Sequence, residues 1–364
     1  MSPKTIIGIT AGDPAGIGPE ITVKCLQSRH FPKDVVPVLF ADRAAIEQAA
    51  RLLGVKVTLR ETSDRKAALA PGRGTAFVDT GVLAGPVKPG RVSAECGKSA
   101  HLSIVAAVDW ALRGWVDGIA TAPIQKEALR LGGCRELDHT EILKVRTGAS
   151  EETTLFVTAS LRVFFLTRHC SLADVPKRIT REAIRLAIPR CLRFLGQLGI
   201  RRPSLAVAAL NPHGGEGGMF GDEEIRIIGP AVAEARVSGL KVDGPIPADS
   251  VFHLAREGRY DGVLSLYHDQ GHIATKTLDF RRTVSLTMGL PFLRTSVDHG
   301  TAFDIAGRGI ADETAMIEAV IAAGLYAKRV RRAQAAGRVR SNRVGKRFAS
   351  RAPDQTAARR TERP

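Results

Sequence analysis

Short runs of apolar, β-branched residues alternate along this chain with longer segments in which hydrophobic positions recur at helical spacing. The short runs predict strands at residues 5–10, 35–41, 118–121, 154–157, 162–167, 204–210, 262–267 and 283–288. The longer segments predict helices, for example at 44–53 and from Thr180 to Gly199. Strands that alternate with helices indicate an α/β fold with a mostly parallel sheet, and such sheets bind ligands beyond the carboxyl ends of their strands.

The length of the chain indicates that the fold is divided into two lobes. A chain of 364 residues is longer than one hydrophobic core usually serves. We therefore expect two α/β lobes, the first formed by about 1–125 with 265–327 and the second by 126–264. Hydrophobic residues make up 44% of the chain and charged residues 25%, which excludes a fibre and a globally disordered protein.

Cysteine usage and hydropathy indicate a cytoplasmic protein. The five cysteines are scattered and odd in number, and no two are spaced C-x-x-C, which is typical of reduced thiols and argues against a zinc ribbon. No uncharged apolar run approaches the roughly 20 residues that span a bilayer. We expect a soluble protein with no membrane partner.

The net charge of +16 is concentrated at the C-terminus. Residues 328–364 hold 13 Lys and Arg against Asp354 and Glu362, a net charge of +11, so the other 327 residues carry only +5. Because Phe348 is its single aromatic residue, this segment cannot form a core, and we expect a basic, disordered tail. The alternative role is weak polyanion binding, since Arg-rich arms bind phosphate backbones.

A glycine-rich turn, Gly12 to Glu20, connects the first strand to a helix that begins near Pro19. Backbone N–H groups in such a turn can approach an anion at the positive end of a helix, and we assign Gly12 and Asp13 to cofactor binding on this ground. The spacing is not the G-x-G-x-x-G of ordinary dinucleotide folds. A tight turn without a ligand is the equal alternative.

Three histidines, His169, His213 and His268, each lie just past the carboxyl end of a predicted strand. Neutral imidazoles that converge there can hold a divalent metal with an open position for a substrate oxygen. Asp269 and Asp249 could then orient the ligands. Because separations of 44 and 55 residues match no local ligand pattern, histidines that only donate hydrogen bonds are the alternative.

Two further groups of residues are candidates for ligand binding. The segment 296–310 exposes backbone that could hold an adenine edge and ribose hydroxyls, with a packed turn as the alternative; its candidate residues are His299, Gly300, Thr301, Asp304 and Gly307. Lys276 and Arg294 supply two permanent positive charges and His139 a titratable third, which suits a carboxylate or phosphate, although such residues are usually solvated surface. We expect His272 to serve structure.

Six motifs follow one another along the chain. They are GDPAGIGPE at 12–20, TAPIQK at 121–126, HTE at 139–141, NPH at 211–213 with GDEE at 221–224, YHDQG at 267–271 and TSVDHGTA at 295–302. Together they resemble the 4-hydroxythreonine-4-phosphate dehydrogenase family of pyridoxal phosphate biosynthesis, from about Thr5 to Tyr326. The resemblance implies an isocitrate/isopropylmalate dehydrogenase-like α/β fold over residues 1–327, with a cleft between two lobes.

The resemblance also implies the cofactors and the assembly. The three histidines would bind a divalent metal, zinc in the first place with magnesium and cobalt as alternatives, and the second subunit of a homodimer would donate one of them. The loop from His299 to Gly309 would take the adenosine of NAD. We expect NAD in preference to NADP, because the Asp304 carboxylate would repel a 2′-phosphate, although Arg308 weakens this inference.

The implied chemistry is oxidation of a phosphorylated hydroxy acid. The substrate-binding residues would be His139, Thr140, Lys276, Ser285 and Arg294, and we assign Lys276 and Asp269 as catalytic. Hydride passes from a secondary alcohol to NAD, and the metal lowers the pKa of the alcohol and stabilises the alkoxide and then the enolate, so that a β-keto acid product can lose carbon dioxide.

Three departures from the family pattern leave the substrate open. Asp138 stands where the family usually has Gly, Gln125 where it has Asn, and Ser285 where it has Asn. Relatives that act on a four-carbon phosphosugar acid or a carboxylated cis-dihydrodiol are therefore alternatives. The rival from another class is a nucleic-acid-binding protein, which the confinement of the excess charge to the tail disfavours.

Overall fold

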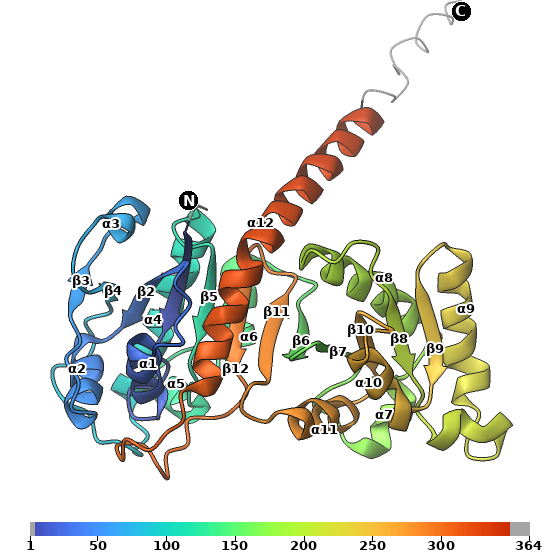
Figure 1. Ribbon diagram of the computed structural model, residues 1–364, viewed down its shortest axis with the longest axis horizontal. Helices are drawn as coiled ribbons and strands as arrows, with labels where there is room; N and C mark the ends of the chain where they lie inside the picture. The colour runs from blue at the N-terminus through green and yellow to red at the C-terminus, as the bar shows by residue number, and fades with distance from the viewer. Residues whose placement is uncertain (1–3, 350–364) are drawn as a thin grey trace, which may run out of the picture.

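The computed structural model describes residues 4–349 and places the side chains of residues 4–336. Within that range the chain forms an α/β fold around one mixed sheet of 12 strands (Figure 1). The strands are β1 Thr5–Thr10, β2 Val35–Ala41, β3 Leu59–Glu61, β4 Thr75–Asp79, β5 Gly118–Thr121, β6 Thr153–Thr158, β7 Leu161–Phe165, β8 Leu205–Ala208, β9 Val242–Ile246, β10 Gly262–Ser265, β11 Val284–Met288 and β12 Leu293–Val297. The helices are α1 Gly18–Gln27, α2 Arg43–Leu52, α3 Arg65–Leu69, α4 Ala94–Arg113, α5 Lys126–Leu131, α6 His139–Thr147, α7 Val175–Arg178, α8 Arg181–Gln197, α9 Gly229–Val237, α10 Ala248–Arg256, α11 His268–Leu278 and α12 Thr314–Ala349, with short turns η1 Leu172–Asp174, η2 Pro212–Gly218 and η3 Glu224–Ile228.

Strand directions divide the sheet into two halves. Its order is β3-β4-β2-β1-β5-β12-β11-β6-β7-β10-β8-β9. The strands from β3 to β12 are mutually parallel, and so are those from β7 to β9. Between these groups, β11 and β6 pair antiparallel with each other and with β12 and β7. The molecule therefore consists of two parallel half-sheets that share an antiparallel seam.

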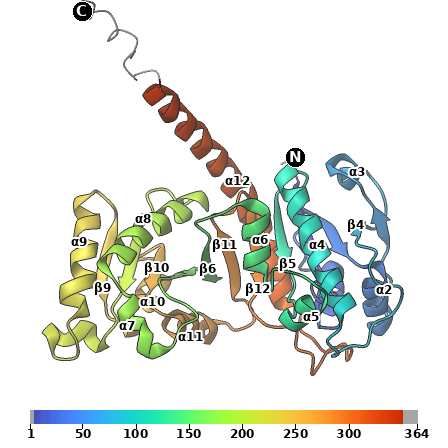
Figure 2. The same cartoon turned by 180° about the vertical axis from the view of Figure 1, so that it is seen from behind.

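Helices cover both faces of each half, as Figures 1 and 2 show from opposite sides. In the first half, Ile7 and Ile9 of β1 belong to the core beneath α1 and α12, whereas Ile6 belongs to the core beneath α4. This alternation follows from the two-residue repeat of a strand. In the second half, α8 and α9 pack on one face while α10 and α11 pack on the other. The predicted α/β class, with strands covered on both faces, is confirmed.

The predicted strands coincide within a few residues with β1, β2, β5, β6, β7, β8, β10 and β11, but the pattern misses β3, β4, β9 and β12. Strand β12 was not predicted because Arg294 and Ser296 interrupt its apolar sequence; both side chains are buried and hydrogen-bond with Thr121 of β5. Strand β9 contains Gly244 and Pro245, which are unfavourable in strands. After β10 the chain continues into α11, which packs on β6, β7 and β10, so it returns to the first half only after residue 278.

Helix α12 continues through the start of the segment predicted to be a disordered tail. Val330 is buried in the main core, and the Arg331 guanidinium donates to the carbonyls of Val116 at 2.8 Å and Ala111 at 3.1 Å. These contacts anchor the helix, so the prediction is wrong for residues 328–336; the rest of α12 projects from the body of the molecule (Figure 1). Residues 350–364 lie outside the described residues. No helix within residues 4–349 is long and apolar enough to cross a bilayer.

Candidate active site

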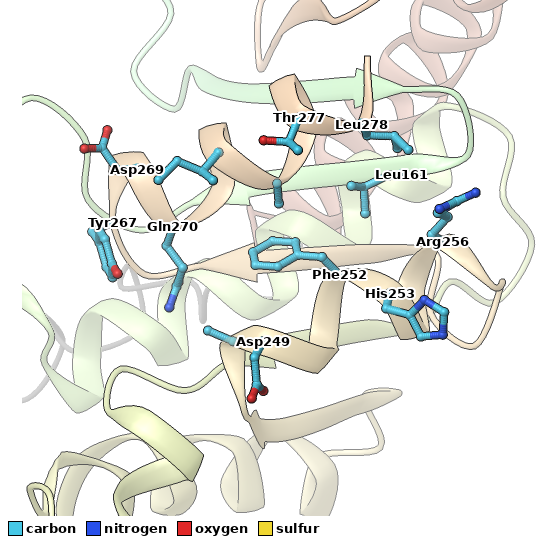
Figure 3. Close-up of a pocket in the computed structure, with 13 residues that line it drawn as sticks. Leu161, Asp249, Phe252, His253, Arg256, Tyr267, Asp269, Gln270, Thr277 and Leu278 are labelled. Carbon is cyan, nitrogen blue, oxygen red and sulfur yellow. The ribbon is translucent and has the colours of Figure 1, made fainter. Parts of the chain in front are cut away.

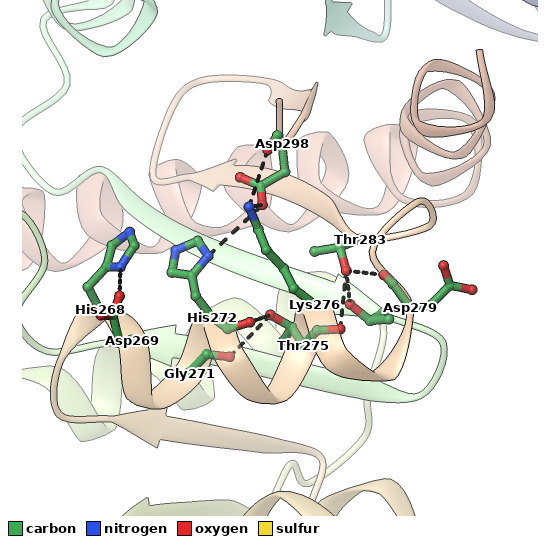
Figure 4. Close-up of polar contacts among 10 residues, drawn as sticks. His268, Asp269, Gly271, His272, Thr275, Lys276, Asp279, Thr283 and Asp298 are labelled. Carbon is green, nitrogen blue, oxygen red and sulfur yellow. Dashed lines mark hydrogen bonds and ion pairs between the residues drawn. The ribbon is translucent and has the colours of Figure 1, made fainter. Parts of the chain in front are cut away.

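Three polar side chains, His268, His272 and Lys276, recur every four residues along α11 and share one face of that helix (Figure 4). The His268 Nδ1 atom lies 2.7 Å from the Asp269 carboxylate, which leaves the Nε2 atom for another partner. The rings of His268 and His272 are stacked with their centroids 4.0 Å apart. Asp269 therefore orients His268, as the sequence predicts.

His169 lies beside His268, because β7 and β10 are parallel neighbours and both residues follow the carboxyl ends of these strands. The centroids of the two rings are 5.8 Å apart. Burial, followed by the charge of Arg168, lowers the pKa of His169, which keeps the imidazole neutral at neutral pH. Two imidazoles at this spacing, one of them oriented by a carboxylate, fit a shared divalent ion.

His213 does not join this pair within one chain. Among the described residues, no three His, Cys, Asp or Glu side chains come close enough together to hold a metal ion. His213 follows β8, which is also a neighbour of β10, and it lies in a turn over 213–217 in which every residue has a positive φ. Glu224 holds the base of this turn by accepting the N–H groups of Leu210 and Asn211 at 2.7 and 2.8 Å.

Lys276 pairs with Asp298, which follows the carboxyl end of β12. The Lys276 Nζ atom lies 2.9 Å from the Asp298 carboxylate and 5.2 Å from the centroid of the Phe280 ring. Burial raises the pKa of Asp298, and Lys276 opposes that shift. Helix α11 thus carries polar residues from the end of β10, in the second half of the sheet, to the end of β12, in the first (Figure 4).

The candidate anion-binding residue Arg294 has a buried guanidinium at the seam of the sheet. Its Nε and one Nη atom donate to the Thr121 hydroxyl at 3.0 and 2.7 Å, and the other Nη donates to Thr287 at 3.2 Å. Burial lowers the pKa of Arg294 to about 10, and none of the described carboxylates forms an ion pair with it. A buried guanidinium bonded only to hydroxyls is suited to an anionic ligand.

His139 begins α6 next to Arg294. Its Nε2 atom is buried and has no hydrogen-bond partner. Burial, with the Arg294 charge, holds the pKa of His139 well below its usual range, so the ring is neutral at neutral pH. The prediction that His139 adds a titratable positive charge is therefore not supported; the neutral ring offers a hydrogen bond instead. An unpartnered ring nitrogen beside a buried guanidinium indicates a place for a ligand.

Asp138, one of the departures from the family pattern, caps α6. Its carboxylate accepts the Glu141 N–H at 3.0 Å, and the Glu141 carboxylate accepts the N–H of Leu137, the residue before the cap, at 2.8 Å, an arrangement related to the capping box. The second Asp138 oxygen lies 3.6 Å from the Lys126 Nζ atom. Asp138 is thus directed at the helix backbone and Lys126, and it leaves Arg294 available for an anion.

The other two substrate-binding candidates lie near this pair. Thr140 follows His139 in the first turn of α6. Ser285 on β11 is paired with Ser296 across the seam, as Thr287 is with Arg294. Because residues directly opposite one another point to the same face, Ser285 and Arg294 share one polar face of the sheet.

The loop after β12 lines a cavity of about 520 Å³. His299 and Gly300 contribute to its wall, and Ala302 and Ile305 give it apolar surface. Such a mostly apolar cavity, next to exposed backbone, suits a nucleoside. Asp304 is exposed and lies outside the wall, so the predicted contact between its carboxylate and the cofactor is not supported.

The Gly12–Glu20 turn uses its N–H groups internally. The Ala15 N–H donates to the Asp13 carboxylate at 2.8 Å and the Gly16 N–H to the Asp13 carbonyl at 3.0 Å. Asp13 is fully buried, and a Cβ atom at Gly12 would lie 2.2 Å from the Pro123 carbonyl oxygen. The buried turn gives no support to the predicted contact of Gly12 and Asp13 with the cofactor, which stays a prediction.

A groove of about 640 Å³ runs between α10 and α11, next to the predicted metal ligands (Figure 3). Tyr267 and Asp269 lie at one end of it, and Ile273, which is 65% exposed, lies along it. Asp249 lies on the α10 side and contacts none of the three candidate histidines within this chain. Its predicted role in orienting them is therefore not supported within one subunit.

The sequence analysis gave no individual role to several residues that border the site. They are Thr121, Thr287, Ser296 and Asp298. Thr121, Thr287 and Ser296 carry hydroxyls on strands that are otherwise apolar and buried. A buried hydroxyl needs a hydrogen-bond partner, so this pattern could have indicated a polar site. Asp298 gave no signal of its own, because its importance comes from Lys276, which is distant in sequence.

Two joined half-sheets, a pair of histidines at strand ends and a cavity beside them are the features of an α/β protein with a ligand site at the carboxyl ends of its strands. The model of the family described as "Pyridoxal phosphate biosynthetic protein PdxA" matches residues 33–323. The chain belongs to this family, and both the family and the enzyme class predicted from the sequence are confirmed.

Individual relatives agree with this assignment. A Clostridium botulinum protein named "Putative D-threonate 4-phosphate dehydrogenase" is 47% identical over 334 residues, which cover 90% of this chain and 99% of that one. The crystal structure of a 4-hydroxythreonine-4-phosphate dehydrogenase from Klebsiella pneumoniae matches with a TM-score of 0.81 at 40% identity, covering 89% of this chain and 98% of that one. A terephthalate 1,2-cis-dihydrodiol dehydrogenase from Burkholderia xenovorans matches with a TM-score of 0.61 at 30% identity, covering 88% and 98%.

Proposed function

We propose that this chain is a metal-dependent NAD oxidoreductase that oxidises the secondary alcohol of a phosphorylated 3-hydroxy acid and then releases carbon dioxide from the β-keto acid. Within this class we propose a four-carbon acid of the D-threonate 4-phosphate type ahead of 4-hydroxythreonine-4-phosphate. The relative at 47% identity is named for the former substrate, and Ser285 replaces the Asn that is usual for the latter.

The observation that carries the proposal is the buried Arg294 guanidinium beside the unpartnered His139 nitrogen. A phosphate group would accept hydrogen bonds from the guanidinium and from the one N–H group of the neutral His139 ring. Thr140 lies in the first turn of α6, where the helix favours negative charge. Arg294 is buried and feels the Asp138 charge without an ion pair to it, so a phosphate could neutralise the guanidinium directly, which favours phosphorylated substrates.

We propose zinc as the metal, held by His169 and His268 of one subunit and by His213 of the second subunit in a homodimer. The 5.8 Å spacing of the first two rings supports this division, as does the lack of a third close ligand among the described residues of one chain. Imidazole ligands suit zinc. When bound, the metal lowers the pKa of the alcohol and stabilises negative charge on its oxygen, and NAD accepts the hydride.

Decarboxylation requires a side chain that delivers a proton to the substrate. Oxidation moves a hydride from C3 and a proton from its hydroxyl; the bond between C1 and C2 then breaks to release carbon dioxide, and C2 takes up a proton. We assign that proton delivery to Lys276, whose Nζ atom is held by Asp298 at 2.9 Å. The Asp269 carboxylate contacts the His268 ring, so we propose a positioning role for it in place of the catalytic role expected from the sequence.

We propose NAD in preference to NADP on different grounds from those in the sequence. Asp304 lies outside the cavity wall, whereas the Asp298 and Asp312 carboxylates belong to it. Arg281 also lines the cavity, but it pairs with Asp312 at 2.9 Å and so is not free to bind a 2′-phosphate. A cytoplasmic location fits the five cysteines, all of which are free thiols.

Initial rates of NAD reduction in the presence of zinc test the function. We expect removal of the substrate phosphate to lower kcat/KM at least about 100-fold, because the buried donors are left unpaired. Ser285→Asn should shift the preference towards 4-hydroxythreonine-4-phosphate. Equal rates with D-threonate and D-threonate 4-phosphate would overturn the phosphate proposal, and faster oxidation of a carboxylated cis-dihydrodiol would favour the substrate of the relative at 30% identity.

A further inference from the structure

We propose that Glu20 and Lys24 are positioning residues for the cofactor, which hold the loop 299–311 in its binding shape before a nucleotide enters. This inference rests on the proposed use of NAD. It gives the Gly12–Glu20 motif a role different from the anion binding expected of a glycine-rich turn. In this role the motif and α1 hold the loop 299–311 by hydrogen bonds.

The first turn of α1 touches the loop directly. The Ile17 N–H donates to the Thr301 carbonyl at 3.0 Å, so this group too is engaged. Gly16 lies so close to the loop that a Cβ atom there would be 2.9 Å from the Thr301 Cβ atom. Ile17 also lines the 520 Å³ cavity. The residues at the start of α1 thus pack against the loop and also form part of the cavity wall.

Glu20 binds the far end of the loop. Its side chain is buried, and its two carboxylate oxygens accept the N–H groups of Gly307 at 2.5 Å and Gly309 at 3.0 Å. No described cation forms an ion pair with it, so these N–H groups supply the stabilisation that a buried carboxylate requires. Both glycines have positive φ angles, a backbone conformation that favours glycine at these two positions.

Lys24, one helical turn after Glu20, completes the attachment. Its Nζ atom donates to the carbonyls of Gly309 at 2.9 Å and Ala311 at 2.6 Å. The loop is therefore held by its N–H groups at Glu20 and by its carbonyls at Lys24. Because Ala311 lines the cavity, this attachment holds one part of the cavity wall in place.

The expected consequence is a loss of cofactor affinity without a change in chemistry. A released loop would have to be ordered at the moment of binding, and that entropy would be subtracted from the binding free energy. Once the nucleotide is bound, the loop is again in place and the reacting groups are unaltered. Variants of Glu20 and Lys24 should therefore raise the KM for NAD and leave kcat nearly unchanged.

The test compares Glu20→Gln and Lys24→Met with wild type and with Glu182→Gln, a matched control on the exposed surface of α8. Calorimetric titration with NAD and with ADP-ribose measures binding without turnover, and hydrogen exchange measures protection of residues 299–311 in the unliganded protein. We expect Glu20→Gln to raise the KM and the dissociation constants about tenfold, the effect of losing one charge-assisted hydrogen bond. The amides of Gly307 and Gly309 should exchange faster, and the control should match wild type.

Several outcomes would overturn the inference. Unchanged exchange in both variants would show that the side chains do not hold the loop. Faster exchange with unchanged NAD and ADP-ribose affinity would make the attachment structural only, and a fall in kcat at constant KM would place its effect in the chemistry. If wild-type protein bound neither NAD nor ADP-ribose, the proposed cofactor itself would fail, and the positioning role with it.

Discussion

Asp13 and Arg294 are both buried, and neither has an ion-pair partner among the described residues. One Asp13 oxygen accepts a backbone N–H, while the other has no hydrogen-bond partner, and burial raises the pKa of this carboxyl to about 6. Arg294 keeps its charge, because burial lowers its pKa only to about 10. At the residue scale, Asp13 therefore costs stability when it ionises, whereas Arg294 holds a charge that a ligand can neutralise.

Asp13→Asn should stabilise the fold in a pH-dependent way. Below pH 4 the carboxyl is protonated in both the folded and the unfolded states; between about 4 and 6 only the folded state retains the proton, so wild-type stability falls as the pH rises through this range. The substitution removes that loss. We expect the gain in the free energy of unfolding to grow from pH 4 to pH 7.5 by about 3 kcal/mol.

Urea denaturation at a series of pH values measures this difference, with Asp304→Asn as the control at an exposed position. A difference between Asp13→Asn and wild type that stays constant from pH 4 to pH 7.5 would contradict the prediction.

Strand β12 and helix α11 contribute more residues to the candidate site than their sequences indicate. Strand β12 places Arg294 at the seam and is followed by Asp298, and α11 brings Lys276 to that end from the other half of the sheet. At the element scale, the polar residues that made β12 difficult to predict are those that face the substrate region. The pattern rules assume that a buried strand is apolar, and a ligand site at a sheet seam breaks that assumption.

Truncation within α12 should separate its anchored part from its projecting part. A chain that ends at Ala327 loses the buried Val330 and the Arg331 hydrogen bonds, and we expect its free energy of unfolding to fall by about 3–5 kcal/mol. A chain that ends at Ala336 keeps these contacts and should match the full chain in stability and turnover. Thermal and urea unfolding of the two chains, with NAD reduction assays, check this; equal stability of the shorter chain would show that the predicted tail does begin at Lys328.

At the scale of the whole molecule, the candidate metal ligands are divided. His169 and His268 are adjacent, whereas His213 stands on its own loop after β8. The groove between α10 and α11 lies beside His268 and exposes Ile273, which suits burial by a second copy. A site completed in this way would exist only in the dimer, so assembly and activity would be coupled.

Mixed dimers test this arrangement. His213→Ala and His268→Ala should each abolish turnover and metal binding while leaving the fold intact. When the two variants are refolded together, half of the dimers are mixed, and each of these contains one intact site, so about a quarter of the wild-type activity should return. Absence of recovery in dimers shown to be mixed would place all three ligands within one subunit.

The sequence by itself determined the family, the α/β class, most strands and the position of each histidine at a strand end. These properties follow from local periodicity and from motifs that lie within a few residues of one another. The same motifs placed His139, Lys276 and Arg294 among the ligand-binding candidates without indicating their partners.

Only the tertiary structure decided how the candidates act. In the folded protein, N–H groups of the Gly12–Glu20 turn donate to Asp13 and to the loop after β12. Burial beside Arg294 keeps His139 neutral, and Lys276 forms an ion pair with Asp298. Each of these properties depends on burial or on a contact between residues that are distant along the chain. Periodicity records which face of an element is apolar, but it does not record which distant element will meet that face, and charge states and ligand sets follow from that meeting.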